Sequence, residues 1–253
     1  MPGHARSAQA VGRRRRPKQK VGRRRRARKR SFLRELPVTL VAALLISLLI
    51  KTFLVQAFLI PSESMEDTLL VHDRVIVNKL ADKPDEIHRG DVVVFRDPGG
   101  WLPDEKADDV GVRGLIHRGL VFVGIAPSAS ARDLVKRVIG VGGDTVVCCD
   151  SQKRVTVNGV PLDESSYLYP GDRATPSQAA FNVRVPQGRL WVMGDHRSES
   201  ADSRFHLGDP GGGFVPVSDV VGRAFARVWP LSRAGWLKQP ATFRQARLLR
   251  RGS

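Results

Sequence analysis

The chain has 253 residues, with 42 Lys or Arg against 25 Asp or Glu, so its formal net charge is +17. The excess lies at one end, because residues 1–34 contain 15 of these basic residues and no acid, while the other 27 nearly balance the 25 acids. This distribution excludes a nucleic-acid-binding protein that is basic throughout its length. An apolar fraction of 42% excludes a fully disordered chain, and two Cys are too few for a disulfide scaffold.

The N-terminal residues 1–34 carry two runs of four arginines, Arg13–Arg16 and Arg23–Arg26. Like charges repel and no apolar periodicity is present, so we predict a disordered basic tail. Such a tail could bind nucleic acid or anionic lipid, or it could be a topology signal for a membrane protein. The segment that follows favours the topology signal.

Residues 36–60 read LPVTLVAALLISLLIKTFLVQAFLI, with Lys51 as the one charged residue. At about 1.5 Å per residue this segment can cross a hydrocarbon core of roughly 30 Å, so we predict a transmembrane helix. The basic flank predicts a single-pass protein of the cell membrane, with a cytoplasmic N-terminus and an extracytoplasmic remainder. The alternatives to a transmembrane helix are a helix of the protein core and a cleaved signal peptide. For a signal peptide, Val55 and Ala57 would be the small residues three positions and one position before the cleavage site.

Residues 61–230 are predicted to form a mainly β domain of antiparallel, coiled sheets, because short apolar or β-branched runs alternate with turn residues. Asn158-Gly159 predicts a tight hairpin turn. We expect an inserted loop region at about 96–133 and a basic C-terminal tail at 231–253. The predicted strands are Arg74–Val77, Val92–Phe95, Leu120–Ile125, Val135–Val141, Thr145–Val147, Arg154–Val157, Arg189–Met193 and Val220–Val228.

Cys148 and Cys149 are adjacent in the sequence. A bridge between neighbouring residues departs from ordinary disulfide geometry, so we expect free or buried thiols.

Two serines, Ser62 and Ser64, directly follow the apolar segment. A serine hydroxyl is a weak nucleophile at neutral pH and needs a base. Lys136 lies between apolar residues of a predicted strand, where burial would lower its pKa from about 10.4 toward neutrality. Lys136 could instead lie on the solvent face of the strand and have no catalytic role. The base for the serine could also be His196.

His196 belongs to a dense polar cluster, Gly194–Arg204, which follows the predicted strand Arg189–Met193. The cluster is typical of a metal loop or of a hydrogen-bonded support for a site. Its acids do not have the spacing of a calcium loop and it contains one His, so we expect no metal and no cofactor.

Four motifs occur in order along the chain, and together with the apolar segment they resemble the bacterial type I signal peptidases, or leader peptidases, in an actinobacterial-like form. The similarity covers about residues 36–230. The motifs are Pro61-Ser62-x-Ser64-Met65, Arg89-Gly90-Asp91-Val92-Val93-Val94-Phe95, Lys136-Arg137-Val138-Ile139-Gly140 with Gly143-Asp144, and Gly194-Asp195-x-Arg197 through Ser200-x-Asp202-Ser203-Arg204.

The resemblance implies a Ser–Lys dyad in which Ser64 is the nucleophile and Lys136 the general base. It implies that Ser62 donates a hydrogen bond in the oxyanion hole. The remaining matched positions support the site or line substrate pockets. The supporting residues are Ser200, which orients the lysine, the pair Asp202 and Arg204, and the residues Asp195 and Arg197; the pocket residues are Met65, Leu69 and Val135.

The resemblance therefore implies a membrane-bound serine endopeptidase, a hydrolase that cleaves N-terminal signal peptides from exported preproteins through an acyl-enzyme. Its expected partners are these preproteins and the lipid bilayer, and no nucleic acid is expected. Two other functions stay open at this point. One is a self-cleaving Ser–Lys protein of the repressor type, and the other is a catalytically idle, membrane-anchored scaffold.

Overall fold

The computed structural model describes residues 35–47, 54–80, 86–103, 132–172 and 180–249. The chain divides into two compact units, Met1–Ile46 and Ser47–Ser253. The predicted disordered tail at 1–34, the predicted strand Leu120–Ile125 and residues 104–131 of the predicted loop region lie outside the described residues.

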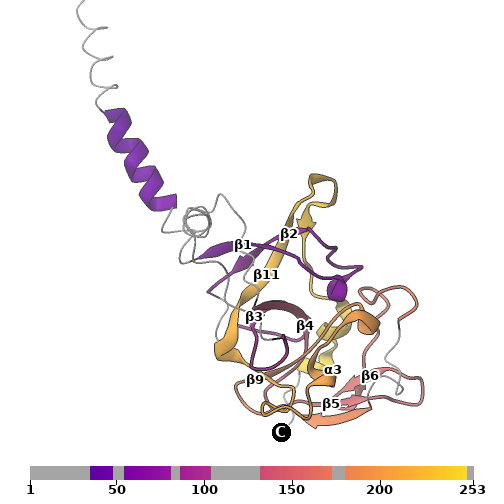
Figure 1. Ribbon diagram of the computed structural model, residues 1–253. Coiled ribbons are helices and arrows are strands. Elements are labelled where there is room, and N and C mark those ends of the chain that lie inside the picture. The colour runs from indigo at the N-terminus through magenta and orange to yellow at the C-terminus, as the bar shows by residue number, and fades with distance from the viewer. Residues whose placement is uncertain (1–34, 48–53, 81–85, 104–131, 173–179, 250–253) are drawn as a thin grey trace, which may run out of the picture. The chain divides into compact units, whose positions relative to one another are not determined.

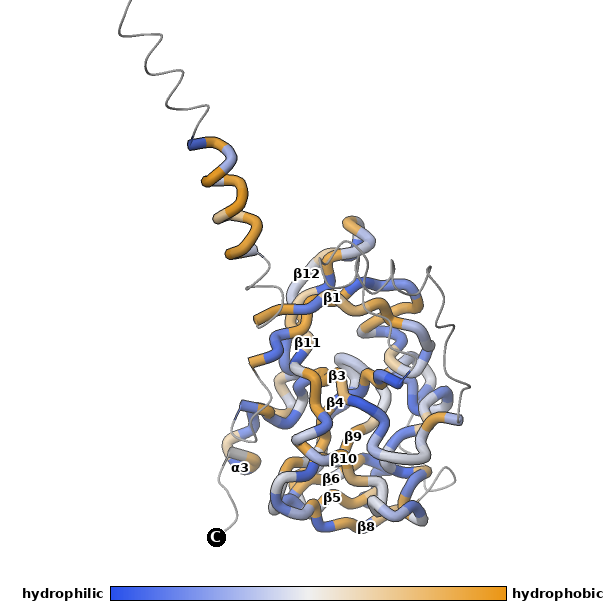
Figure 2. Tube along the Cα trace, turned by 60° about the vertical axis from the view of Figure 1, so that its left-hand side comes forward, coloured by the Kyte–Doolittle hydropathy of each residue, from blue (hydrophilic) through white to orange (hydrophobic). Residues whose placement is uncertain are grey.

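Residues 35–47 are helical and exposed, and Thr39 Oγ1 donates a hydrogen bond to the Glu35 carbonyl. Most of this helix is coloured as hydrophobic in Figure 2. Within the described ranges, no helix combines the length and the apolar character that a membrane crossing requires.

The second unit begins with strand β1, Val55–Leu59, which pairs antiparallel with β2, Arg74–Asn78. The predicted helix over residues 36–60 is therefore wrong at its C-terminal end. The cause is burial, because Phe58 and Ile60 are almost fully enclosed in the core of the β unit. Cleavage after Ala57, the alternative of a signal peptide, would cut through β1.

Eight strands form the larger sheet, in the order β1-β2-β11-β3-β4-β9-β10 with β12 beside β11 (Figure 1), and all its pairings are antiparallel. Register shifts occur in β11 and β4, and such irregularities increase the local twist and bend a sheet. The bounds of the remaining strands are Val92–Arg96 for β3, Asp133–Val141 for β4, Arg189–Met193 for β9, Val215–Pro216 for β10, Val220–Trp229 for β11 and Gly235–Trp236 for β12.

A smaller sheet has the order β7-β6-β5-β8 and lies at the opposite end of the unit from β1 in both Figure 1 and Figure 2. The predicted Asn158-Gly159 turn joins β6 to β7, and both residues have the positive φ (52° and 74°) that such a turn requires. Its strands are Thr145–Cys148 for β5, Val155–Val157 for β6, Val160–Pro161 for β7 and Phe181–Arg184 for β8.

The prediction of a mainly antiparallel β fold is confirmed, and seven of the eight predicted strands coincide with observed strands. The connecting turns contain short helices. These are η1 (Glu63–Met65), η3 (Arg197–Glu199), η4 (Ser203–Phe205), η5 (Val217–Asp219), η6 (Leu231–Arg233), η7 (Ala241–Arg244) and α3 (Ala246–Leu249).

The expectation of free thiols is wrong, because Cys148 and Cys149 form a disulfide.

The segment after residue 230 is part of the fold, so the prediction of a C-terminal tail beginning at 231 is wrong. Phe243 and Leu248 are 1% and 0% exposed and join the apolar cluster that contains β5, β6 and β9 side chains. Arg89 fixes this segment further, since its Nη1 donates to the Leu248 carbonyl at 2.8 Å and its Nε donates to Asp144 at 2.6 Å.

Replacing Phe243 by Ala should therefore lower the free energy of unfolding of the full chain by about 3–5 kcal/mol, the usual cost of deleting a buried aromatic ring. Urea unfolding in a non-ionic detergent measures this. Leu231→Ala is the matched control, because Leu231 is 75% exposed, and should change the value by less than about 0.5 kcal/mol. Equal, small effects of both substitutions would restore the tail interpretation.

Candidate active site

Ser64 lies in the short helix η1, directly after β1, and is 4% exposed. Ser62 precedes the helix in an extended conformation, and its hydroxyl oxygen lies 3.3 Å from the Ser64 hydroxyl oxygen. Among the described residues, the Ser64 backbone N–H has no hydrogen-bond acceptor. One backbone donor and one hydroxyl donor are thus present beside the Ser64 hydroxyl.

Lys136 lies in β4, where it is paired with Val93 of β3, and is 3% exposed. Its Nζ lies 2.5 Å from Ser64 Oγ, so the structure brings together the two residues that the sequence singled out. Desolvation lowers the pKa of the lysine from its ordinary 10.5 to about 8, although the carboxylates of Asp202 and Asp195 act in the opposite direction. The amine can therefore lose its proton near neutral pH, and it is in contact with a hydroxyl.

Asp202 is the centre of a buried hydrogen-bond network beside the lysine. Its carboxylate accepts from the Gly194 backbone N–H at 2.9 Å, from Ser200 Oγ at 2.8 Å and from Arg204 Nε at 2.8 Å. Burial alone would raise the pKa of Asp202, but the hydrogen bonds and charge of Arg204 hold it below its ordinary value. Asp202 therefore stays ionised and its charge acts on Lys136.

The resemblance implies that Ser200 orients the lysine. Within the described residues Ser200 Oγ donates to Asp202, and no hydrogen bond joins it to Lys136. Ser200 thus holds the carboxylate whose charge acts on Lys136.

Asp195 is the centre of a second buried network. Its two carboxylate oxygens accept from Arg137 Nε at 2.8 Å and Nη2 at 2.6 Å, and Thr68 Oγ1 donates to it at 2.6 Å. A two-point contact between guanidinium and carboxylate fixes both groups in orientation. This pair ties β4 to the turn after β9, and Thr68 ties both to the segment after η1.

Arg197, fully buried, pairs with Glu164 through two hydrogen bonds and donates from Nε to the Gly194 carbonyl. Burial by itself lowers the pKa of a guanidinium, but Glu164 holds the pKa of Arg197 above its ordinary value. Tyr167 also donates to Glu164, at 2.6 Å.

His196 was the alternative base. Its backbone N–H donates to the Ser64 carbonyl at 3.2 Å, but its imidazole stacks on Tyr169 with ring centroids 3.9 Å apart. The ring Nδ1 lies 3.4 Å from Glu66 Oε2. In the described part of the chain the Ser64 hydroxyl contacts Lys136 and Ser62 instead.

The three residues predicted to line substrate pockets also meet. Met65, Leu69 and Val135 belong to one apolar cluster, and they are 1%, 0% and 8% exposed. Met65 directly follows Ser64 and Val135 directly precedes Lys136, so this cluster lies on the two segments that carry the pair.

Sequence reasoning missed Glu164 and Gly194 as functional positions. Glu164 has no motif around it, so nothing marked it. Gly194 was quoted in a motif, but its role follows from packing, because a Cβ there would collide with the Ser200 side chain and the Ser64 carbonyl. The absence of a side chain thus allows the turn after β9 to approach η1.

A sequence model described as "Signal peptidase, peptidase S26" matches residues 33–229. The signal peptidase I of Mycobacterium tuberculosis (strain ATCC 25618 / H37Rv) is 45% identical over 227 residues, which cover 82% of this chain and 76% of the relative. The chain belongs to the signal peptidase family, peptidase S26.

Other members of the signal peptidase family are also similar. The probable signal peptidase I of Mycobacterium leprae (strain TN) is 41% identical over 237 residues, covering 82% of this chain and 80% of the relative. A solved signal peptidase I from Enterococcus faecalis V583 has a TM-score of 0.33 and 23% identity, and covers 54% of this chain and 95% of its own. As a family member, this chain is a serine endopeptidase, which is a hydrolase.

Gly194→Ala should lower kcat/KM for peptide-bond cleavage about 100-fold, because the added methyl group displaces the Ser200 turn from Ser64 and a misplacement of about 1 Å has an effect of that size. Cleavage kinetics with a fluorogenic peptide measure this. Gly208→Ala is the control, since no atom lies within 4 Å of a Cβ at Gly208. Equal activity of both variants would contradict the packing argument.

Proposed function

We propose that this chain removes signal peptides from exported preproteins, with Ser64 as nucleophile and Lys136 as general base. The observation that carries the proposal is the buried Lys136 amine, 2.5 Å from the Ser64 hydroxyl, with its pKa lowered to about 8. A general base works best when its pKa lies near the working pH.

In the acylation step, neutral Lys136 Nζ takes the proton of Ser64 Oγ while the oxygen bonds to the scissile carbonyl carbon. The tetrahedral intermediate then breaks its carbon–nitrogen bond. The leaving amine receives the proton from the Lys136 ammonium, and the signal peptide remains as an ester on Ser64.

In the deacylation step, Lys136 takes a proton from a water molecule, whose oxygen attacks the ester carbonyl. The ester bond breaks and Ser64 Oγ recovers a proton from Lys136. Both residues return to their starting forms, so the reaction needs no cofactor.

The oxyanion of each intermediate would be held by the Ser64 backbone N–H and the Ser62 hydroxyl. Both donors lie beside Ser64 Oγ, and loss of one such donor typically reduces kcat about 10²–10³-fold. Met65, Leu69 and Val135 would line the pockets for the small side chains before the cleavage site, because they share one apolar cluster on the segments that carry the pair.

A membrane anchor is the second part of the proposal. The apolar residues from 36 to 54, before β1, number enough to cross about 28 Å of hydrocarbon as a helix. The basic residues 1–34 would stay in the cytoplasm, with the peptidase unit outside. Alkaline carbonate should leave the full chain in membranes and release a chain lacking residues 36–54; release of both would refute the anchor.

A preprotein with an Ala-x-Ala site should be cut by the purified full chain in detergent and lipid. Ser64→Ala and Lys136→Ala should each reduce kcat by at least about 10²–10⁴-fold, because each removes one member of the proposed pair. His196→Ala is the control and should keep most activity. Activity in Lys136→Ala together with loss in His196→Ala would transfer the role of base to the histidine.

The pH dependence gives an independent check. Only neutral Lys136 can accept the proton, so kcat/KM should rise with pH with a midpoint near 8. Asp202 favours the ammonium form, so Asp202→Asn should move the midpoint to lower pH. Asp219→Asn removes a charge outside these contacts and should leave the midpoint unchanged. An upward shift in Asp202→Asn would contradict the assignment.

A further inference from the structure

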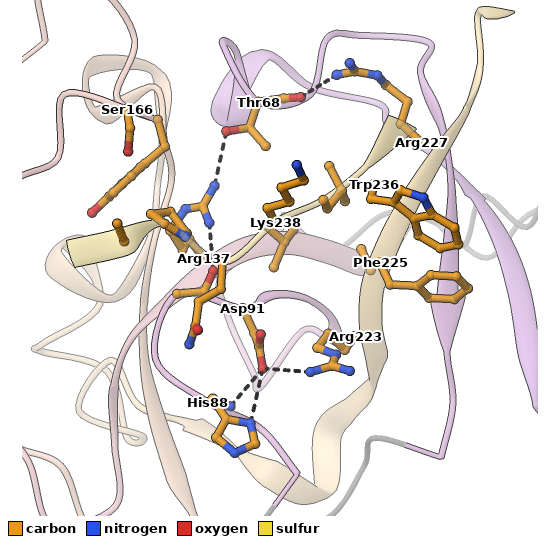
Figure 3. Close-up of a pocket in the computed structure, with 18 of the residues that line it drawn as sticks. Thr68, His88, Asp91, Arg137, Ser166, Arg223, Phe225, Arg227, Trp236 and Lys238 are labelled. Carbon is orange, nitrogen blue, oxygen red and sulfur yellow. Dashed lines mark hydrogen bonds and ion pairs between the residues drawn. The ribbon is translucent and has the colours of Figure 1, made fainter. Parts of the chain in front are cut away.

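A concave site exists apart from the Ser64–Lys136 pair. It is a pocket of about 850 Å³ between β3, β4 and β11 on one side and residues 236–244 on the other (Figure 3). Neither Ser64 nor Lys136 lines it. Arg137 does, and because consecutive strand residues point to opposite faces, Arg137 and Lys136 face different sides of β4.

Positive charge dominates the lining. Five Lys or Arg side chains border the pocket, against two acids, Asp67 and Asp91. The five cations are Arg137, Arg223, Arg227, Lys238 and Arg244.

Three of the arginines have partners within the protein. Arg137 is paired with Asp195, and Arg227 donates to the Thr68 carbonyl at 2.7 Å. Arg223 lies 3.6 Å from Asp91, but its Nε is buried and has no hydrogen-bond acceptor. A buried donor without an acceptor costs free energy, and 36% of the Arg223 side chain stays exposed.

Lys238 and Arg244 have neither an ion pair nor a side-chain hydrogen bond within the described ranges. Figure 3 shows Lys238 among the residues that line the pocket, and no dashed line joins it to any of them. Two cations therefore border one concave site without an ion pair of their own among the described residues.

The wall beside β12 is aromatic. Phe225 and Trp236 stack with ring centroids 5.9 Å apart, and Trp236 is 72% exposed. The pocket thus offers an apolar surface next to its charged surface, and its volume is far greater than a single oxyanion occupies.

We propose that this pocket binds a phosphate ester, with the phosphate oxygens on Lys238, Arg244 and Arg223 and the organic part against Phe225 and Trp236. Guanidinium groups match the geometry of phosphate oxygens, and a lysine adds a compact charge. The site is independent of the proposed catalytic pair, so either proposal can fail without the other.

The test uses the full chain in non-ionic detergent at constant ionic strength, with glycerol phosphate as the probe. Calorimetry should give a Kd below about 1 mM, and Lys238→Ala/Arg244→Ala should raise it at least about tenfold. Arg184→Ala/Arg247→Ala is the matched control, since it removes two exposed charges outside the pocket and keeps the basic N-terminal residues. Equal weakening in both double variants would overturn the proposal.

Amine acylation followed by mass spectrometry locates the bound ligand without any substitution. At about ten times its Kd, glycerol phosphate should slow acylation of Lys238 about tenfold by mass action and leave Lys153, exposed on another part of the surface, unchanged. Equal protection of both lysines, or of neither, would overturn the proposal.

The phosphate could come from a lipid headgroup or from a soluble ester, and the same labelling distinguishes them. Nanodiscs of phosphatidylglycerol are compared with nanodiscs of phosphatidylcholine and with free glycerol phosphate. Selective protection of Lys238 by the phosphatidylglycerol discs supports the proposal with a lipid source, and protection by the free ester alone supports it with a soluble source. No protection of Lys238 in any arm contradicts it.

Discussion

The burial of one amine beside one hydroxyl is the constraint on which the rest of the site depends. Lowering the pKa of Lys136 from 10.5 to about 8 corresponds to roughly 3 kcal/mol by which its surroundings disfavour the charged form. That effect exists only while water is kept away from Nζ. Strand β4 supplies the exclusion, because it lies between β3 and β9 within the larger sheet and leaves Lys136 only 3% exposed.

Paired charges around the lysine hold this arrangement in place. Asp202 with Arg204, Asp195 with Arg137, and Glu164 with Arg197 are three buried ion pairs, each satisfied by further hydrogen bonds. Removing one partner of such a pair leaves an uncompensated buried charge, which is strongly destabilising. The pairs join β4, the turn after β9 and the segment after η1, so the same contacts that stabilise the fold also fix the distance between Ser64 and Lys136.

Much of this could be predicted where the signal was local. The strand Arg189–Met193 follows from a short apolar run bounded by turn residues, and the Asn158-Gly159 turn follows from turn chemistry. Four ordered motifs marked Ser64 and Lys136. Strand β1 could not be predicted, because its apolar residues continue an apolar run and periodicity does not separate helix from strand there. The packing of Phe243 and the pairing of Glu164 with Arg197, 33 residues apart, are set by distant contacts that no local pattern records.

The most direct test of the account is the titration of the Lys136 amine itself. NMR of the full chain with lysine labelled at Cε and Nζ, assigned by the signal that disappears in Lys136→Ala, reports the charge of this one group. The account predicts a midpoint near pH 8 for Lys136. A Lys136 midpoint above about 10 would mean that the amine is charged at neutral pH, and it would contradict its role as the base.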